Sequence, residues 1–256
     1  MPRTRRVPRG TFVDLGAFDV PEVAVGRRVR AYLPHNHDHS RPRPVLVLFD
    51  GQNVFGDEGS FSGGWHAHEV LDRFVVLKRP VAPVILAIDH GHVARLDELT
   101  PWSDGKNGGK LDPFLAWIGG ALLPLARNTL GLRHDPSETI VGGSSLGGFA
   151  ALYAHFARPD VFGGCLVMSP SLWFAGGRIF PFVASRPRPP SSRIYLDCGV
   201  KEARGMMFGH SERMARELAG RGYGEDAFLW RPDAKGTHSE RHWRRRLPKA
   251  LRFMFR

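Results

Sequence analysis

Two adjacent serines, Ser144 and Ser145, lie among four glycines in the stretch VGGSSLGG at 141–148. Gly143 stands two residues before Ser145 and Gly147 two residues after it, which gives the pattern G-x-S-x-G. Glycines at these positions allow a sharp strand-to-helix turn that exposes the serine hydroxyl as a nucleophile. The same frame does not fit Ser144, because a leucine stands where its second glycine would be needed. We therefore predict Ser145 as the nucleophile and Ser144 as a spacer.

A serine nucleophile needs a base that accepts its proton and an acid that orients this base. Four histidines follow Ser145 in the chain and could supply the base: His155, His210, His238 and His242. Three of them fall in segments with helical patterning. His238, in AKGTHSERHW, instead occupies a loop that follows the last predicted strand and is opened by Gly236. We predict His238 as the base.

Short apolar runs alternate with helix-like segments along most of the chain. The strand-like runs begin with a predicted antiparallel pair, GTFVDLGAFDV and RRVRAYLP, and continue with RPVLVLFDG, APVILAIDHG, ETIVGGSS, FGGCLVMSP, RIYLDCG and DAFLWRPD. The helix-like segments include GWHAHEVLDRFVVLK and LDPFLAWIGGALLPLARNTLG. This rhythm predicts a mostly parallel eight-stranded sheet with helices on both faces. In such a sheet the active site lies beyond the carboxyl ends of the strands.

Five motifs in fixed order carry a family resemblance: LFDGQNVF, GGSSLGG, SPSLWF, LDCGVKE and GTHSERHW. From about residue 25 to the C-terminus, the chain resembles the esterase D family of α/β-hydrolases, especially its siderophore-esterase-like and predicted-hydrolase branches. The resemblance implies the α/β-hydrolase fold, a Ser-His-acid triad and no cofactor. It also implies an oxyanion hole made by the backbone N–H groups of Gln52 and Leu146.

The acid of the triad has two candidates in YLDCGVKEARG, Asp197 and Glu202. Asp197 lies inside an apolar run that is typical of a strand, whereas Glu202 follows the first break at Gly199. An acid that reaches His238 over the sheet edge should lie in the loop, and this family usually has Asp or Glu there. We predict Glu202, with Asp197 at the strand end as the alternative.

Several loops at the predicted carboxyl edge carry polar and aromatic side chains that could line a substrate cleft: Asp50, Trp65, His90, His92, Arg95, Glu98, Trp102 and Trp173. The segment between SPSLWF and RIYLDCG is short, so no large lid is expected and the cleft could admit a bulky siderophore or aromatic ester. The histidines of HNHDHS are expected in a surface turn, and no metal site is predicted.

The composition suits one folded domain, predicted over residues 11–256 after a basic tail at 1–10. The chain has 256 residues, of which 42% are hydrophobic, and no apolar run is long enough for a membrane span. Cys165 and Cys198 both lie in strand-like apolar runs. Two buried thiols are typical of a reducing compartment, so a cytoplasmic protein is expected.

The formal net charge of +11 could indicate nucleic-acid binding or attraction of an acidic small substrate. The basic residues are scattered, except in the N-terminal tail and in the C-terminal segment RHWRRRLPKALRFMFR, which is expected to be a last helix with a solvated basic face. No nucleic-acid module is recognised, so no nucleic-acid partner is predicted. We predict a serine esterase that cleaves small-molecule carboxylic esters through an acyl-enzyme. An acyltransferase, or a non-catalytic binding protein on the same scaffold, are the alternatives. The sequence carries no signal of the oligomeric state.

Overall fold

The computed structural model describes residues 7–60, 62–76, 81–105 and 107–256. Of the basic tail predicted at 1–10, residues 1–6 lie outside the described residues. Among the helices of the described part, none is long and apolar enough to cross a bilayer.

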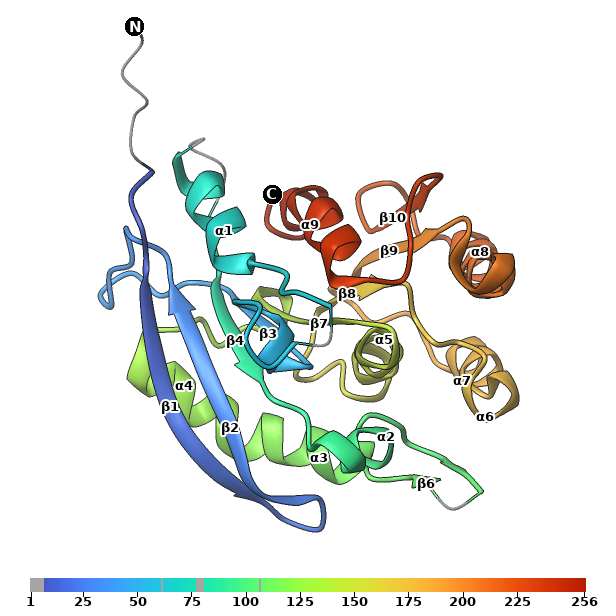
Figure 1. The fold of residues 1–256 in the computed structure, drawn as a ribbon, viewed down its shortest axis with the longest axis horizontal. Helices are drawn as coiled ribbons and strands as arrows, with labels where there is room; N and C mark the ends of the chain where they lie inside the picture. Colours follow the sequence, from blue (N-terminus) through green and yellow to red (C-terminus); the bar gives the residue numbers. More distant parts are fainter. Residues whose placement is uncertain (1–6, 61, 77–80, 106) are drawn as a thin grey trace, which may run out of the picture.

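The core element is an eight-stranded sheet with the order β1-β2-β4-β3-β7-β8-β9-β10 (Figure 1). Its strands are β1 Thr11–Val20, β2 Ala24–Leu33, β3 Val45–Leu48, β4 Val84–Ile88, β7 Thr139–Ser144, β8 Gly164–Met168, β9 Arg193–Gly199 and β10 Phe228–Asp233. The pairs from β4 through β10 are parallel, whereas β1 and β2 pair antiparallel with each other and β2 pairs antiparallel with β4. The predicted mostly parallel sheet with a leading antiparallel pair is confirmed.

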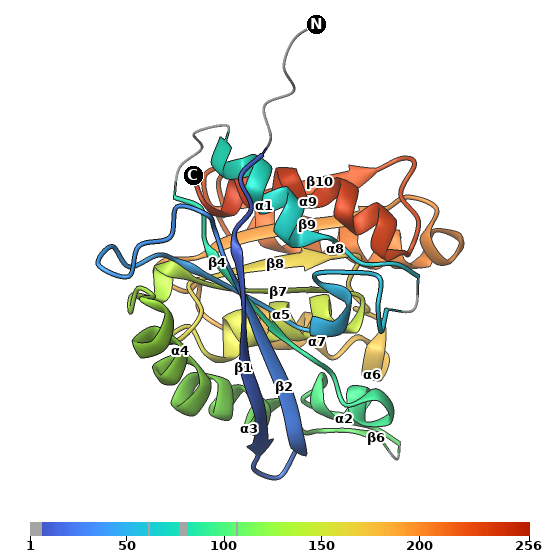
Figure 2. The ribbon, with the colours of Figure 1, turned by 60° about the vertical axis from the view of Figure 1, so that its left-hand side comes forward.

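Helices cover both faces of the sheet (Figure 2). On one face lie α1 Ala67–Val76 and α9 Glu240–Met254; on the other lie α3 Leu111–Trp117, α4 Leu123–Leu130, α5 Leu146–Ala157, α7 Ile179–Ser185 and α8 Met206–Gly220. Within β3, Val45 and Val47 pack into one hydrophobic core while Leu46 and Leu48 pack into the other. Central strands are apolar on both faces because neither face meets water.

Two predicted helices differ from the observed ones. The segment 64–78 was expected to be helical throughout, but α1 begins only at Ala67 because His66 adopts a left-handed backbone with φ 48°. The segment 111–131 contains a π-helical turn, η3 Ile118–Leu122, between α3 and α4. A Cβ added at Gly119 would lie 3.1 Å from a methyl group of Val161. Gly119 therefore lets the π-helical turn approach Val161 closely, whereas an added Cβ at Gly120 would meet no atom within 4 Å.

Short elements follow the carboxyl ends of the strands and carry most of the candidate site. They are η1 Gly51–Asn53 after β3, η2 His92–Ala94 and α2 Arg95–Glu98 after β4, α6 Phe174–Gly177 after β8, and η5 Glu202–Gly205 after β9. A small hairpin, β5 Ser103–Asp104 and β6 Asn107–Gly108, follows α2, and η4 Pro136–Glu138 precedes β7.

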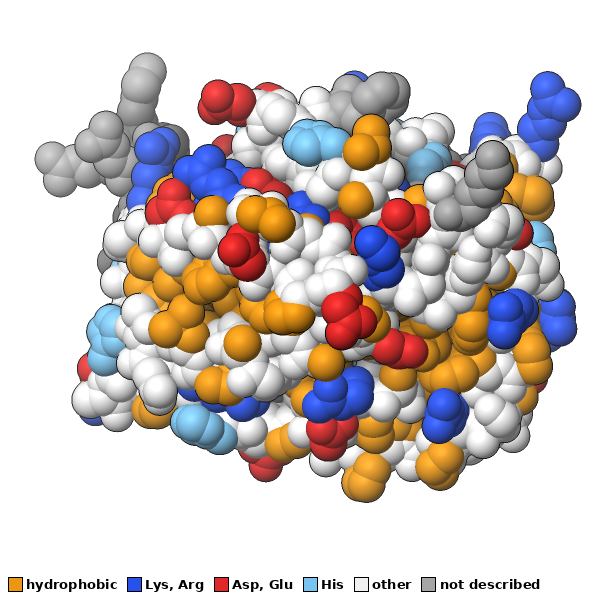
Figure 3. Space-filling model, turned by 90° about the horizontal axis from the view of Figure 1, so that it is seen from below, with side chains coloured by type: hydrophobic (Ala, Val, Ile, Leu, Met, Phe, Trp, Pro, Cys, Tyr) orange, Lys and Arg blue, Asp and Glu red, His pale blue; other side chains and the backbone are white. Residues whose placement is uncertain are grey.

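The surface in Figure 3 carries acidic, basic and hydrophobic side chains interspersed over one face of the molecule. Charges of one sign do not form a continuous patch in this view. This distribution agrees with a largely solvated surface charge on that face.

The strand-to-helix turn after β7 depends on close backbone contact, which generates a testable expectation. A Cβ added at Gly143 would meet the carbonyl carbon of Gly147 at 2.6 Å. Gly143→Ala should lower the free energy of unfolding by about 1–3 kcal/mol, because backbone must shift to relieve the clash. Urea denaturation measures this change.

The matched control is Gly209→Ala in α8, where an added Cβ meets no atom within 4 Å. That substitution should be neutral or stabilise the chain by up to about 1 kcal/mol, since alanine is the better helix former. A Gly143→Ala variant as stable as the parent chain would show that the turn does not need this contact.

Candidate active site

Ser145 occupies the sharp turn between β7 and α5, with φ 56° and ψ −121°. A positive φ at a residue with a side chain is strained, at a cost of about 1–3 kcal/mol. Two backbone hydrogen bonds hold the turn: Ser145 N–H donates to Met168 O and Ser171 N–H donates to Ser145 O, both at 3.0 Å. Ser144, by contrast, is the last residue of β7 and is buried. Only the second serine therefore presents its hydroxyl at the edge of the sheet.

His238 lies between Ser145 and Glu202. Its Nε2 is 3.0 Å from Ser145 Oγ, and its Nδ1 is 2.8 Å from Glu202 Oε2. The loop that carries His238 after β10 lies directly against the end of β9, since a Cβ added at Gly199 would meet Gly236 O at 2.4 Å. Contact between these two glycines brings base and carboxylate together, although they are separated by 36 residues in the chain.

The Glu202 carboxylate is buried, with only 2% of the residue exposed. Its second oxygen, Oε1, accepts hydrogen bonds from Gly199 N–H at 2.9 Å and from Ser169 Oγ at 2.8 Å. Burial would raise the pKa of Glu202, but the hydrogen bonds from His238 and Ser169 outweigh it and hold the pKa below its usual value. The carboxylate is therefore charged at neutral pH while shielded from water.

Ser169 fixes the orientation of that carboxylate. Its Oγ accepts hydrogen bonds from Trp243 Nε1 at 3.0 Å and from Arg246 Nη2 at 2.7 Å. Because both lone pairs of the hydroxyl are then used, its single proton is directed to Glu202. Two residues of α9 thus act through one serine on the carboxylate that faces His238.

Asp197, the alternative acid, lies in the interior of β9 and has other partners. It accepts a hydrogen bond from Tyr195 OH at 2.9 Å and forms an ion pair with Arg246 Nε at 3.1 Å. Burial raises the pKa of Asp197 to about 6, against the opposing charge of Arg246. Of the two candidate acids, Glu202 is the one within hydrogen-bond reach of His238.

The two backbone N–H groups expected to form an oxyanion hole lie on loops packed against each other. Leu146 is the first residue of α5, so its N–H has no partner within the helix. Gln52 lies in η1, and its side-chain oxygen accepts the backbone N–H of His90 at 3.1 Å. A Cβ added at Gly147 would lie 2.9 Å from Asp50 Oδ2, so the η1 loop touches the first turn of α5.

Asp50 and Arg95, both predicted to line a cleft, form a bidentate ion pair. Arg95 Nε donates to Oδ1 at 2.6 Å and Nη2 donates to Oδ2 at 2.7 Å. Asp50 is buried and lies immediately before η1. Its backbone adopts the left-handed conformation, with φ 58°. The pair therefore holds the loop of Gln52 in place. Arg95 retains substantial exposure, whereas the burial of Asp50 corrects the expectation that its side chain lines the cleft.

The other predicted cleft residues divide by burial. His92 is exposed, His90 and Trp102 are partly exposed, and Trp173 is 44% exposed. His90 Nδ1 accepts the backbone N–H of His92, and burial followed by the charge of Arg95 lowers the pKa of His90. These four side chains remain accessible from the carboxyl edge or the surface.

Trp65 and Glu98 correct the sequence-based expectation, because the structure buries both. Trp65 is 3% exposed and packs in the core with Trp243, their rings 6.2 Å apart. Glu98 is fully buried, pairs with Arg27 and accepts the backbone N–H of Gly91. Neither side chain faces a cleft, since apolar packing holds the first and ion pairing the second.

Sequence reasoning missed Ser169, Ser171 and Arg246. Ser171 Oγ lies 3.3 Å from Ser145 Oγ. Arg246 falls three residues after Trp243 and one before Leu247, within the apolar stripe of α9, and is buried. A cation inside an apolar stripe indicates a buried acid partner, and that signal could have identified Arg246.

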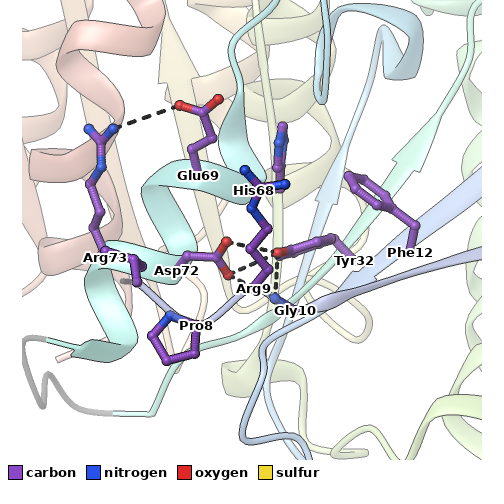
Figure 4. Close-up of a pocket in the computed structure, with 10 residues that line it drawn as sticks. Pro8, Arg9, Gly10, Phe12, Tyr32, His68, Glu69, Asp72 and Arg73 are labelled. Atoms are coloured by element: carbon purple, nitrogen blue, oxygen red, sulfur yellow. Dashed lines mark hydrogen bonds and ion pairs between the residues drawn. The ribbon is translucent and has the colours of Figure 1, made fainter. Parts of the chain in front are cut away.

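A cavity of about 1060 Å³ lies elsewhere, among the N-terminal residues, β1, β2 and α1 (Figure 4). Its lining includes Phe12, Tyr32, His68 and Asp72, and none of the residues around Ser145. Asp72 accepts hydrogen bonds from Tyr32 OH at 2.9 Å and Gly10 N–H at 3.1 Å. These contacts anchor β2 and the residue before β1 to α1. None of Ser145, His238 and Glu202 lines the cavity, so it is separate from the candidate active site.

The sheet topology and the serine turn after β7 define an α/β-hydrolase, and the predicted fold class is confirmed. A model of the Esterase family, described as "Putative esterase", matches residues 23–254. The chain belongs to this family, and the prediction of a carboxylic ester hydrolase is confirmed at that level.

Three similar proteins illustrate the relationship. The chain is 22% identical over 246 residues to the uncharacterized protein YbbA of Bacillus subtilis, covering 91% of this chain and 94% of YbbA. It is 45% identical over 148 residues to the iron(III) enterobactin esterase of Dickeya dadantii, covering 58% of this chain but only 31% of that enzyme. The crystal structure of the BES protein from Bacillus cereus superposes with a TM-score of 0.78 at 16% identity, covering 100% of this chain and 99% of that one.

The contacts of Ser169 generate a stability prediction. Ser169→Ala removes the acceptor of two buried donors, Trp243 Nε1 and Arg246 Nη2. Leaving buried donors unpaired should lower the free energy of unfolding by about 1–3 kcal/mol, measured by urea denaturation. The exposed Ser191→Ala serves as control and should change it by less than about 0.5 kcal/mol. Equal stability of the two variants would contradict the assigned hydrogen bonds.

Proposed function

We propose that this chain is a serine esterase that cleaves carboxylic esters through an acyl-enzyme, with Ser145, His238 and Glu202 as its triad. The observation that carries the proposal is the continuous hydrogen-bonded row from Ser145 Oγ through the His238 ring to Glu202, with contacts of 3.0 and 2.8 Å. A hydroxyl, an imidazole and an ionised carboxylate in this order have the geometry of nucleophilic acyl transfer.

In the proposed first step, His238 Nε2 takes the proton of Ser145 as its oxygen attacks the ester carbonyl. The buried charge of Glu202 stabilises the imidazolium that forms. Backbone N–H groups of Leu146 and Gln52 are proposed to stabilise the tetrahedral oxyanion, an effect worth several kcal/mol in such sites. The imidazolium then protonates the departing alcohol, which leaves Ser145 acylated.

In the second step, His238 takes a proton from water, and the resulting hydroxide attacks the acyl-enzyme. Collapse of the second tetrahedral intermediate releases the carboxylic acid and returns the proton to Ser145. The overall reaction consumes only the ester and one water molecule. Every protein group that it uses lies at the carboxyl edge of the sheet.

We propose a bulky, aromatic ester as the substrate class, with a siderophore ester as its leading example. Trp173 is exposed two residues after Ser171, and the exposed apolar side chains of Val200 and Met206 flank Glu202 in the chain. Aromatic and apolar surface of this kind suits a large aromatic ligand. The relative from Dickeya dadantii is named for iron(III) enterobactin, and the net charge of +11 favours an anionic ester.

The narrower placement in the esterase D branch is part of the same proposal. We also propose a cytoplasmic location, because both Cys165 and Cys198 are buried free thiols, which suits a reducing compartment.

The nucleophile is tested with a short chromogenic acyl ester and with iron(III) enterobactin as substrates. Ser145→Ala should lower kcat by about three or more orders of magnitude on either ester, because among the described residues Ser145 alone has its hydroxyl within hydrogen-bond reach of His238 Nε2. Ser144→Ala, the adjacent control, should retain most of the activity. A reversal of the two results would assign the nucleophile to the other serine, and hydrolysis of only the short ester would contradict the proposed substrate class.

The acid is tested by comparing Glu202→Gln with Asp197→Asn in kcat measured across about pH 5 to 8. Glu202→Gln should lower kcat by orders of magnitude, because the imidazolium loses its countercharge. Since the pKa of Glu202 is held below its usual value, this carboxylate stays charged as the pH falls. Loss of activity on acidification in the parent chain should therefore not come from protonation of Glu202.

Asp197→Asn should retain far more activity than Glu202→Gln, because Asp197 does not contact the imidazole. If Asp197→Asn were the more damaging change while circular dichroism showed both variants folded, the assignment of the acid would be wrong.

A further inference from the structure

A second concave site lies between the edge strand β10 and the helix α9. Its volume is about 360 Å³, and we call it the β10–α9 groove, lined by Tyr195, Arg231, Pro232, Asp233, Ala234, Lys235, Arg245, Arg246 and Lys249. None of Ser145, His238 and Glu202 is among these residues. The groove is thus separate from the proposed triad, although Lys235 lies three residues before His238.

The lining of the β10–α9 groove is strongly basic. Five of its side chains are cationic, and Asp233 is the one acid among them. Asp233 is already neutralised, since Arg245 Nη2 contacts its Oδ2 at 2.6 Å and Arg246 Nη1 lies 3.5 Å away. Within the described part of the chain, Arg231, Lys235 and Lys249 make no ion pair with an acid. The concave surface therefore has several positive charges left without a counterion.

The side chains of the inner wall of the groove are buried and held in place by hydrogen bonds and ion pairs. Arg246 is 7% exposed, and its guanidinium is held by the hydrogen bond to Ser169 and the ion pair with Asp197. Its Nη1 is a buried donor without a hydrogen-bond partner among the described residues. Tyr195, also in the wall, is fixed by its hydrogen bond to Asp197. The charge of Arg246 is compensated by the nearby carboxylates of Asp197, Glu202 and Asp233, so Arg246 and Tyr195 form a rigid wall. The uncompensated positive charge of the groove comes from Arg231, Lys235 and Lys249.

We propose that the β10–α9 groove binds a phosphate group, carried by a small phosphomonoester or present as the free ion. Guanidinium groups match the oxygens of phosphate, and lysine ammonium groups add point charges around them. The volume of about 360 Å³ suits a small ligand. None of the three proposed triad residues lines the groove, and its proposed occupant is distinct from the ester substrate.

The test is binding of inorganic phosphate to the full chain, by isothermal titration calorimetry and by thermal unfolding. Sodium chloride at the same ionic strength corrects for screening. Phosphate should raise Tm by a few degrees at concentrations well above its Kd, because it binds only the folded state. The double variant R231Q/K249Q should weaken phosphate binding about tenfold or more.

The matched control is R241Q/R252Q, which removes the same charge from exposed positions of α9 outside the groove. It should change the Kd for phosphate by less than about twofold, since long-range surface charge is screened. Absence of phosphate binding, or an equal loss in both double variants, would overturn the proposal. Binding to phosphatidylglycerol vesicles or RNA without binding of phosphate alone would overturn it too. Because the readout is binding, failure here leaves the proposed esterase activity unaffected.

Discussion

A carboxylate removed from water must find other groups to stabilise its charge, and this requirement shapes the centre of the molecule. Glu202 is 2% exposed, yet its pKa lies below the usual value. The stabilising groups come from three directions: the backbone N–H of Gly199, the hydroxyl of Ser169 and the ring of His238. Each of these contacts also positions an element, so electrostatics and loop geometry are set by the same bonds.

The final helix is the support on which this arrangement depends. Trp243 and Arg246, one turn apart on α9, both donate hydrogen bonds to the Ser169 hydroxyl. Ser169 in turn donates a hydrogen bond to Glu202. Arg246 also forms ion pairs with Asp197, Glu202 and Asp233, so three carboxylates share one cation. Removing one partner from a buried ionic cluster leaves the remaining charges uncompensated. The helix therefore contributes more than apolar packing: it keeps neighbouring acids in distinct electrostatic states.

Several arginines have specific local partners. Arg95 neutralises Asp50 beside the η1 loop, Arg27 neutralises Glu98 and Arg246 neutralises Asp197 of β9. These cations are counterions for acids that the fold encloses. The groove beside β10 differs, because its cations outnumber the acids available to them. Net charge alone could not distinguish these two situations, since both contribute equally to the sum.

The features that could be predicted from sequence are those that depend on the spacing of residues close together in the chain. The glycines around Ser145, the apolar runs of the central strands and the loop position of His238 each depend on a few neighbouring residues, because backbone sterics and burial act over that range. The placement of Glu202 beyond Gly199 could be proposed in the same way. Side chains on the connecting loops could not be assigned, and Trp65 and Glu98 turn inward although their positions in the chain favoured a cleft.

Tertiary structure alone decided which distant groups meet. Ser169 and Arg246 are 77 residues apart in the chain, and no spacing rule connects them. They meet because the amphipathic helix α9 packs across β8 and β9, which places Trp243 and Arg246 over the ends of these two strands. The sequence by itself determined the strand-and-helix order and the candidate nucleophile, since these follow from local periodicity. The protonation state and orientation of the candidate acid were decided by packing, because desolvation and hydrogen bonding depend on what surrounds a group in space.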